Sequence, residues 1–372
     1  MQSVIISIMS RSMIYSCSVM MMGKFLIYGS YGYTGQLIVE LAVKDGMRPI
    51  LAGRDEKKLR TQAEKYNLEY RAFPLEETDK LESALLEVDA VLHCAGPFVL
   101  TFRQMAEACI RTKRHYVDIS GEIEGFEALA ILDDEAKDAN IMMMPGGGFD
   151  VVPSDCLAAY LHKKLPTATN LRLFIRGIGG GISRGTARSG VENMHREGRI
   201  RKDSKLTQVP PAWKVREQDF GRGPVRVVSV GWGDVSTAYY STKVPNIETY
   251  FALPHIAISF LKLSRVIGPL VYSRPVRNLL KWLIGYVFPP GPSRSRNETG
   301  YSLIVGEMRD DDRVVRAKLR VPEGYWCTAL TTVEIMKRIS NGDLKTGFQT
   351  PSLAYGADFI LQFNGVERED LQ

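Results

Sequence analysis

Cysteine and histidine are scarce in this sequence of 372 residues, which holds five of each. The cysteine count is odd, and no two cysteines form a C-x-x-C pair. This pattern argues against a disulfide framework and a zinc site, and it indicates a reducing compartment. We therefore expect no metal. The cysteines are Cys17, Cys94, Cys109, Cys156 and Cys327.

Acidic residues are absent from one long stretch. Residues 249–297 hold seven basic residues and no acidic one, while the whole chain has a net charge of +6. The rest of the chain therefore sums to about −1, so its basic character belongs mainly to this stretch. Because the stretch is apolar rather than studded with aromatic residues, we expect no nucleic-acid binding.

Long apolar runs are missing from the same stretch. Its longest uncharged run is residues 249–261, whereas a membrane span needs about 20 apolar residues. We expect Pro254, Pro269 and Pro275 to break the stretch into short helices. The piece after Pro275 places Arg274, Arg277 and Lys281 beside an apolar side made by Leu279, Leu280, Leu283, Ile284 and Val287.

A basic side next to an apolar side is typical of a helix that lies on anionic lipid. We therefore predict peripheral membrane contact through residues 250–288. A core helix or a contact in a homodimer explains the pattern equally well.

Residues 1–22 contain a single charged residue and are rich in methionine and serine. The serines interrupt the apolar run, and nothing resembles a signal-peptide cleavage site. We interpret the segment as a disordered leader, or as the result of a start codon placed too early, with Met20, Met21 or Met22 as the natural start.

A glycine triplet follows a short apolar strand at residues 25–28 and precedes a helix at 36–42. Strand, glycine-rich turn and helix in this order predict a dinucleotide-binding turn. Gly29 allows the sharp turn, Gly32 leaves room for a pyrophosphate, and Gly35 lets the helix lie close to the sheet. An ordinary glycine-rich turn is the alternative. The predicted cofactor-binding residues are Gly29, Ser30, Tyr31, Gly32, Tyr33, Thr34 and Gly35.

Arg54 ends the second predicted strand, where an acidic residue would meet the ribose of NAD. A cation there, with Lys57 one turn further on, suits the 2′-phosphate of NADP(H). A solvated basic helix start is the alternative. Asp55 is expected to cap the helix over residues 56–66.

Strands and helices alternate over residues 24–144, which predicts an α/β fold with a doubly wound parallel sheet of the Rossmann type. The strand at 90–95 ends in Ala95, Gly96 and Pro97, which we expect to bind the cofactor. The strand at 141–144 runs into Gly147 and Gly148, which we expect near nicotinamide or substrate, although a plain loop is the alternative. From residue 171 the chain is richer in strands, so we expect a second, α+β domain, with residues 198–224 as a polar loop.

Proton-donor candidates also lie at the predicted sheet edge. We single out Tyr116, Asp118, Ser120 and Asp150 as catalytic candidates, with Glu122 beside them. Asp118 could instead be a buried structural carboxylate, and Glu122 could cap the following helix. No Ser/His/Asp arrangement or carboxylate pair favours hydrolysis.

Several segments together resemble the saccharopine dehydrogenase-like oxidoreductases, and most of all their bacterial branch of trans-acting enoyl reductases. The resemblance covers roughly residues 23–365 and rests on Gly29–Gly35, Ala52–Arg54, Cys94–Phe98, Tyr116–Glu122, Pro145–Asp155 and Glu323–Pro351.

This resemblance implies a Rossmann domain for NADP at 23–152, an inserted substrate domain at 153–345, and a C-terminal segment, 346–372, that returns to the first domain. It implies reduction of a lipid-linked C=C bond in the enoyl reductase branch, or of an imine in the saccharopine enzymes. Many relatives carry cysteine where this chain has Gly147, so a thiol role is not carried over.

We therefore expect an NADP(H)-dependent enoyl reductase that acts on a lipid-like substrate at a membrane surface. A saccharopine-type imine reductase and a non-catalytic NADP-binding membrane protein are the alternatives. We expect a cytoplasmic protein that contacts the inner face of the membrane.

Overall fold

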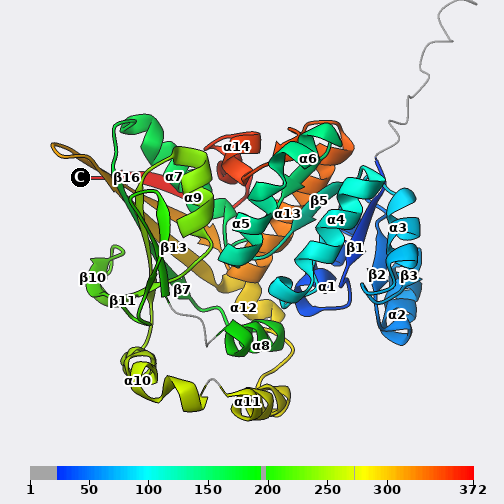
Figure 1. Ribbon diagram of the computed structural model, residues 1–372, viewed down its shortest axis with the longest axis horizontal. Helices are drawn as coiled ribbons and strands as arrows, with labels where there is room; N and C mark the ends of the chain where they lie inside the picture. Colours follow the sequence, from blue (N-terminus) through cyan, green and yellow to red (C-terminus); the bar gives the residue numbers. More distant parts are fainter. Residues whose placement is uncertain (1–22, 194–197, 272) are drawn as a thin grey trace, which may run out of the picture.

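The computed structural model describes residues 23–193, 198–271 and 273–372. The predicted leader at 1–22, with Cys17, lies outside these residues. Two sheets lie side by side, with helices packed between them and around the first sheet (Figure 1).

The first sheet has seven parallel strands in the order β15-β6-β5-β4-β1-β2-β3. The chain reverses its direction of winding between β1 and β4, the point where doubly wound sheets bind ligands. The predicted Rossmann-type fold is confirmed. The strands are β1 (Phe25–Tyr28), β2 (Ile50–Gly53), β3 (Tyr70–Ala72), β4 (Ala90–His93), β5 (His115–Asp118), β6 (Met142–Met144) and β15 (Gly347–Phe348).

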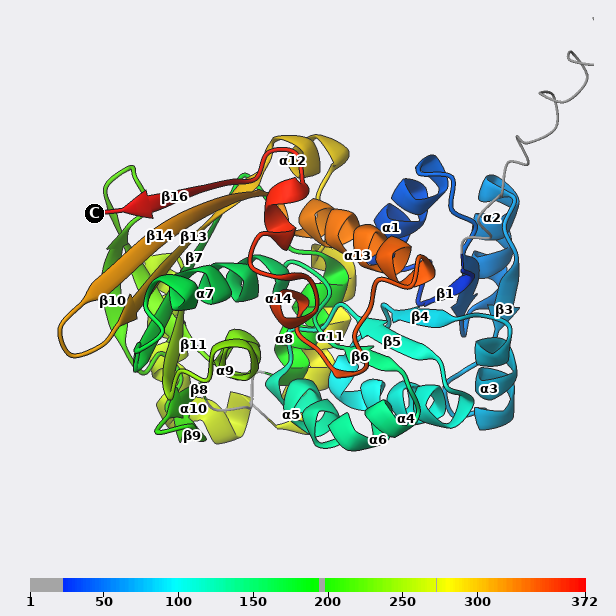
Figure 2. The ribbon, with the colours of Figure 1, turned by 90° about the horizontal axis from the view of Figure 1, so that it is seen from above.

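Helices cover both faces of this sheet (Figure 2). Phe25 and Ile27 of β1 pack into one core with α1 and α13, whereas Leu26 and Tyr28 pack into another with α3 and α4. Burial on both faces is why these strands are continuously apolar in sequence. The helices are α1 (Tyr33–Lys44), α2 (Glu56–Tyr66), α3 (Thr78–Leu86), α4 (Phe102–Thr112), α5 (Ile123–Ile131), α6 (Asp133–Asp138) and α13 (Gly324–Ser340).

The second sheet has nine strands of mixed direction, and α7 (Val152–Lys164) and α9 (Asp234–Thr242) cover its inner face. This arrangement confirms the predicted α+β character of the second half. The strands are β7 (Asn170–Ile178), β8 (Gly198–Lys202), β9 (Lys205–Val209), β10 (Val215–Asp219), β11 (Pro224–Val230), β12 (Asn246–Ala252), β13 (Tyr301–Arg309), β14 (Val314–Pro322) and β16 (Glu367–Leu371).

The prediction of a polar loop over residues 198–224 is wrong, because the segment forms β8, β9 and β10. Asp203 and Ser204 both adopt a positive φ and close the hairpin between β8 and β9. These strands lie toward the border of the sheet and keep many side chains in solvent, so they need few apolar residues. Their polarity concealed them in the sequence.

The C-terminal part of the chain joins both sheets. Helix α13, which the predicted boundaries assign to the second domain, packs on α1 and β4 of the first. Strand β15 pairs with β6, and β16 pairs with β14 of the second sheet after α14 (Pro351–Tyr355). The domain boundaries stay predictions, but the first sheet takes its last strand from beyond the second domain.

Four helices lie along one side of the molecule, at the bottom of Figure 1. They are α8 (Arg184–Asn193), α10 (His255–Val271), α11 (Arg274–Val287) and α12 (Arg294–Thr299). The predicted break at Pro269 is wrong, because α10 continues past it to Val271. Among the described residues, no helix is both long and apolar enough to cross a membrane.

Candidate functional site

The segment Gly29–Gly35, called here the first glycine turn, leaves its backbone open. Gly29 has a φ of +85°, and Gly32 is exposed. A β-carbon built on Gly32 would meet only the carbonyl oxygen of Gly29, at 3.2 Å. Helix α1 starts at Tyr33 and has no side-chain cap. The N–H groups of its first turn are therefore available to an anion, and the helix dipole favours negative charge there.

Side chains of the first glycine turn brace it against the protein. The Ser30 hydroxyl donates to Gln62 Oε1 at 2.8 Å, and Gln62 Nε2 donates to the Ser30 carbonyl at 3.0 Å. The Tyr33 hydroxyl donates to the carbonyl of Pro292 at 2.8 Å and accepts from Asn297 Nδ2 at 2.7 Å. The side chains of Ser30 and Tyr33 are therefore engaged within the protein, and the N–H of Tyr33, in the first turn of α1, is the group that a ligand could reach. The long-range contact of Tyr33 had no signal in the sequence.

Basic residues surround the end of β2. Arg54 is exposed, and within the described residues it forms no hydrogen bond or ion pair. Lys57 is also exposed, while Lys58 pairs with Asp55 at 2.9 Å and lies 5.4 Å from the ring centre of Tyr31. The Asp55 carboxylate accepts from Lys58 N–H at 3.1 Å, which confirms the predicted helix cap. The Arg54 guanidinium remains available for a phosphate.

The turn after β4 touches the first glycine turn. A β-carbon on Gly29 would lie 2.9 Å from the backbone nitrogen of Ala95, so the two turns share one wall of the site. The Thr101 hydroxyl donates to the Ala95 carbonyl at 2.8 Å and contacts His93 Nε2 at 2.9 Å. Burial lowers the pKa of His93 to about 3, so its imidazole is neutral. Thr101 and His93 therefore fix the turn Ala95–Pro97, and neither residue was predicted to belong to the site.

Two of the catalytic candidates on β5 bond to each other. The Tyr116 hydroxyl donates to Asp118 Oδ2 at 2.6 Å, and both residues are buried. Asp118 Oδ1 accepts from the N–H groups of Ser120 at 2.9 Å and Gly146 at 2.8 Å. Burial raises the pKa of Asp118 despite these hydrogen bonds. The Asp118 carboxylate ties β5 to the turn after β6, as the structural alternative expected.

Asp150 is placed differently, because it is only half-buried and its carboxylate accepts no hydrogen bond among the described residues. Burial, and then the negative charge of Glu122, raise the pKa of Asp150 to about 7. A β-carbon on Gly121 would lie 2.8 Å from Asp150 Oδ2, so the carboxyl packs against the loop after β5. A carboxyl with a pKa in this range can act as a general acid near neutral pH.

The alternative role for Glu122, a cap on the following helix, is not observed, since its side chain makes no capping bond to α5. Its carboxylate instead accepts from the N–H groups of Phe98 at 3.3 Å and Val99 at 2.5 Å. These N–H groups begin the short 3₁₀ helix at Phe98–Leu100 and have no partner within it, so a carboxylate satisfies them. Glu122 thus links the ends of β4 and β5.

The segment Pro145–Gly148, called here the second glycine turn, is closed by the protein itself. A β-carbon on Gly147 would lie 3.0 Å from Val117 Cγ1, and one on Gly148 would lie 2.8 Å from Thr328 Cγ2. The Gly147 carbonyl also accepts from Thr331 of α13 at 2.8 Å. Both glycines are buried, and residues of β5 and α13 occupy the space into which a side chain at either position would extend.

Comparison with known proteins agrees with this geometry. The family model of the saccharopine dehydrogenase NADP binding domain matches residues 25–144. This part of the chain is therefore similar to a saccharopine dehydrogenase NADP binding domain. The chain as a whole has the fold of the histidine-tagged apo saccharopine dehydrogenase (L-Glu forming) from Saccharomyces cerevisiae, with a TM-score of 0.65 and 13% identity over 94% of this chain and 100% of that one.

Two curated relatives match a smaller part. The trans-acting enoyl reductase of Mycobacterium ulcerans is 27% identical over 149 residues, or 38% of this chain. A probable mitochondrial saccharopine dehydrogenase-like oxidoreductase of Arabidopsis thaliana is 29% identical over 152 residues, or 35% of this chain. The chain spans 36% and 32% of the lengths of these two relatives.

The residues of the NADP-binding domain fit the cofactor. The open backbone at Gly32 and the uncapped start of α1 would hold the pyrophosphate, and Arg54 would hold the 2′-phosphate. Thr34 and Gly35 lie in the first turn of α1, so their N–H groups face the same anion. A β-carbon on Gly35 would lie 2.6 Å from the Gly29 carbonyl, so glycine also permits the close packing of α1.

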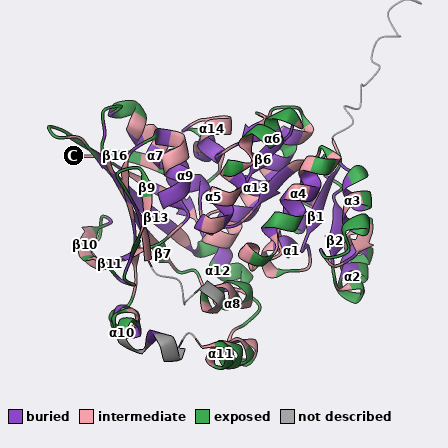
Figure 3. Ribbon diagram, viewed as in Figure 1, coloured by how far each residue is buried: buried purple, intermediate pink, exposed green. Residues whose placement is uncertain are grey.

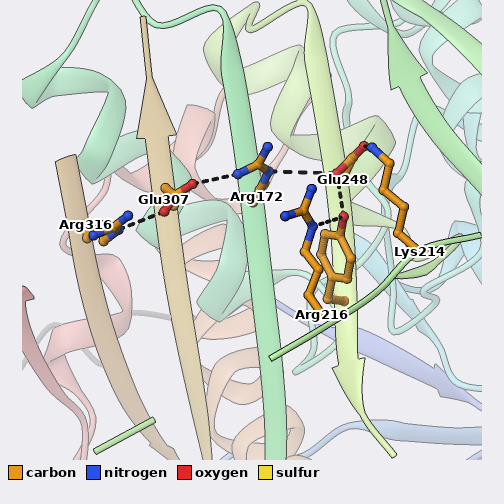
Figure 4. Close-up of polar contacts among 7 residues, drawn as sticks. Arg172, Lys214, Arg216, Glu248, Glu307 and Arg316 are labelled. Carbon is orange, nitrogen blue, oxygen red and sulfur yellow. Dashed lines mark hydrogen bonds and ion pairs between the residues drawn. The ribbon is translucent and has the colours of Figure 1, made fainter. Parts of the chain in front are cut away.

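A hollow of about 530 Å³ lies on the outer face of the second sheet, away from both glycine turns. Arg172 contacts Glu307 at 2.9 Å and Glu248 at 3.8 Å, and Arg316 contacts Glu307 at 2.7 Å (Figure 4). Lys214, which directly precedes β10, pairs with Glu248 of β12. The ion pairs of Arg172 and Arg316 join adjacent strands and stabilise the sheet, and the three cations of this cluster outnumber its two carboxylates.

Within the described residues, no group of three His, Cys, Asp or Glu side chains is arranged to hold a metal ion. The four described cysteines are free thiols. They are Cys94, Cys109, Cys156 and Cys327, and burial raises the pKa of each thiol.

Proposed function

We propose that the chain is an NADP(H)-dependent oxidoreductase that reduces the C=C bond of a lipid-like enoyl substrate. The NADP-binding domain supports the cofactor, and the distant enoyl reductase relatives support the substrate class. The single observation that carries the chemistry is Asp150, a half-buried carboxyl beside the sheet edge with a pKa of about 7. Such a group is protonated often enough at neutral pH to act as a general acid.

NADPH, when bound, supplies a hydride to one carbon of the double bond. The other carbon must then gain a proton, and the Asp150 carboxyl is the donor that we assign. The carboxylate left behind is repelled by Glu122, which favours its reprotonation from solvent. The hydrogen bond from the Tyr116 hydroxyl to the Asp118 carboxyl fixes both side chains at the end of β5.

The same carboxylates disfavour an amino-acid substrate of the saccharopine type. Such a substrate carries carboxylates of its own, and the negative charge of Glu122, which already raises the pKa of Asp150, would repel them. An enoyl substrate with an uncharged double bond meets no such repulsion. This difference supports the proposal of an enoyl substrate over an imine substrate.

The test is NADPH oxidation by the purified chain with an enoyl thioester and, separately, with an imine formed from an amino acid and a keto acid. We expect oxidation with the enoyl substrate, with a rate that falls as pH rises through about 7, because only protonated Asp150 donates. Asp150→Asn should lower the rate by roughly 100-fold or more while the thermal shift caused by NADPH persists. The matched control is Asp134→Asn, since Asp134 is 98% exposed.

Glu122→Gln sharpens the assignment. The neutral amide removes the charge that raises the pKa of Asp150, so the fall in rate should move to lower pH. If NADPH is oxidised with the imine but not with the enoyl thioester, the proposed enoyl substrate is wrong and the substrate is of the saccharopine type. Binding of NADPH without oxidation on either substrate would favour the non-catalytic alternative.

A further inference from the structure

Helix α11 turns its apolar side to solvent. Its exposed residues follow one helical face, and Trp282, Tyr286 and Val287 are 57%, 75% and 72% exposed. Figure 3 shows α11 mainly in the colours of exposed and half-buried residues, at the lower border of the molecule. We call this surface the outer face of α11. It consists of Leu279, Trp282, Leu283, Tyr286 and Val287.

The opposite side of α11 faces the protein. Ile284 is buried, Arg277 and Lys281 are half-buried, and a β-carbon on Gly285 would lie 3.5 Å from Arg188 of α8. A helix that belonged to the core would have its large apolar residues on this inner side. Five large apolar residues face outward instead, and exposed apolar patches of this kind mark interaction sites.

Helix α10 extends the same surface. It contacts α11, and its Ile256 and Leu263 are 83% and 52% exposed, with Lys262 exposed between them. Trp282 and Tyr286 lie with ring centres 4.8 Å apart, and such rings are favoured at the boundary between lipid and water. Apolar residues, aromatic rings and cations therefore gather on one side of the molecule.

The charge of this stretch selects the partner. Residues 249–297 hold no acidic residue, and α10 and α11 expose three basic ones, Lys262, Arg265 and Arg274, which we call the basic patch. In a two-fold symmetric contact between copies of the chain, the same basic patch would face itself and repel. An anionic bilayer surface attracts the same charge and accepts the apolar side chains at its headgroup boundary. We propose that α10 and the outer face of α11 dock on a membrane that contains anionic lipid.

The position of this surface connects it to the NADP-binding domain. The Arg184 guanidinium of α8 donates to the Phe288 carbonyl at the end of α11, at 3.2 Å and 3.0 Å. A β-carbon on Gly96 would lie 3.5 Å from Ser189 of α8. Helix α8 thus lies between α11 and the turn after β4, so a lipid-like substrate would leave the membrane beside the cofactor. This last step rests on the proposed function, whereas the docking itself does not.

The experiment is co-sedimentation of the full chain with vesicles of phosphatidylcholine alone and of phosphatidylcholine with phosphatidylglycerol. We expect binding to the anionic vesicles at low salt, weaker binding at high salt, and little binding to phosphatidylcholine alone. The double variant Trp282→Glu/Tyr286→Glu should lower the bound fraction by about tenfold or more. Its matched control is Ile131→Glu on α5, since Ile131 is 81% exposed and lies on another part of the surface.

For every variant, thermal unfolding is also measured with and without NADPH. Loss of vesicle binding with an unchanged NADPH shift supports the docking surface, whatever substrate the site takes. The proposal is overturned if the unmutated chain ignores anionic vesicles at low salt, or if the double variant binds them as well as Ile131→Glu does. It is also overturned if light scattering shows a dimer that the double variant dissociates while neither protein binds vesicles, because a second copy then covers the face.

Discussion

The first sheet carries two glycine-rich turns at the same edge, and Gly32 of the first has surroundings opposite to those of Gly147 and Gly148 of the second. In the first glycine turn, Gly32 is exposed and the space in front of it is open. In the second, Gly147 and Gly148 are buried, and residues of β5 and α13 fill that space. A glycine allows close approach in both places, by a ligand in one and by the protein in the other. The sequence motif does not say which partner approaches.

The largest expected effect comes from filling the closed turn. Gly147→Val adds branched atoms where even a β-carbon would lie 3.0 Å from Val117 and 3.3 Å from Ile335. Overpacking of this kind should cost about 3 kcal/mol or more of the free energy of unfolding. Thermal denaturation measures the loss. A variant that stays as stable as the parent but loses its NADPH response would instead place Gly147 at the cofactor.

Filling the open turn should abolish binding rather than folding. Gly32 has φ −65° and ψ 163°, which any residue adopts, so Gly32→Val should leave the protein folded. Its branched side chain would occupy the place of the pyrophosphate, and the thermal shift with NADPH should disappear. Gly32→Ala is the graded control. Retention of the full NADPH shift by the valine variant would refute the assignment of the open turn.

Changing the charge beside the open turn should have a smaller effect. Arg54→Asp removes the guanidinium that would grip the 2′-phosphate and puts a repulsive carboxylate in its place. We expect NADPH to bind about 10- to 100-fold more weakly while NADH binding changes little. Titration calorimetry with both cofactors measures the ratio, with Arg54→Lys as an intermediate control. Equal affinities for both cofactors in the unmutated protein would contradict the preference.

The smallest effect concerns the hydrogen bonds that hold the closed turn. Tyr116→Phe removes the donor to Asp118, whose carboxylate also binds the N–H of Gly146. Loss of one buried hydrogen bond should cost about 1–2 kcal/mol of stability, with the reductase rate nearly unchanged. If the rate instead falls by orders of magnitude at unchanged stability, Tyr116 rather than Asp150 is the proton donor.

Local patterns account for what the sequence predicted well. Strand β1, the glycine triplet and α1 are adjacent in the chain, and the Asp55 cap lies three residues from its partner. The sequence therefore holds all the information for these features. The strands β8–β10 escaped prediction because they are only partly buried, so solvent rather than a core selects their side chains.

Long-range contacts account for what could not be predicted. The closed state of the second glycine turn depends on Thr328 and Thr331, far along the chain in α13. Nothing in the sequence around Tyr33 predicts its hydrogen bond to the carbonyl of Pro292, 259 residues away. Likewise, the amphipathic pattern of α11 shows two faces, and only the fold shows that the apolar one is outside.

The first sheet cannot be completed until strand β15, near the C-terminus, has been synthesised. Its partner β6 ends at Met144, but Gly347 and Phe348 emerge from the ribosome roughly 200 residues later, a delay of about 10–40 s. Until then β6 is an unprotected sheet edge, which is the kind of surface that pairs with other chains. The nascent protein therefore passes through a period of heightened aggregation risk, and a fragment that ends after β6 would stay in that state permanently.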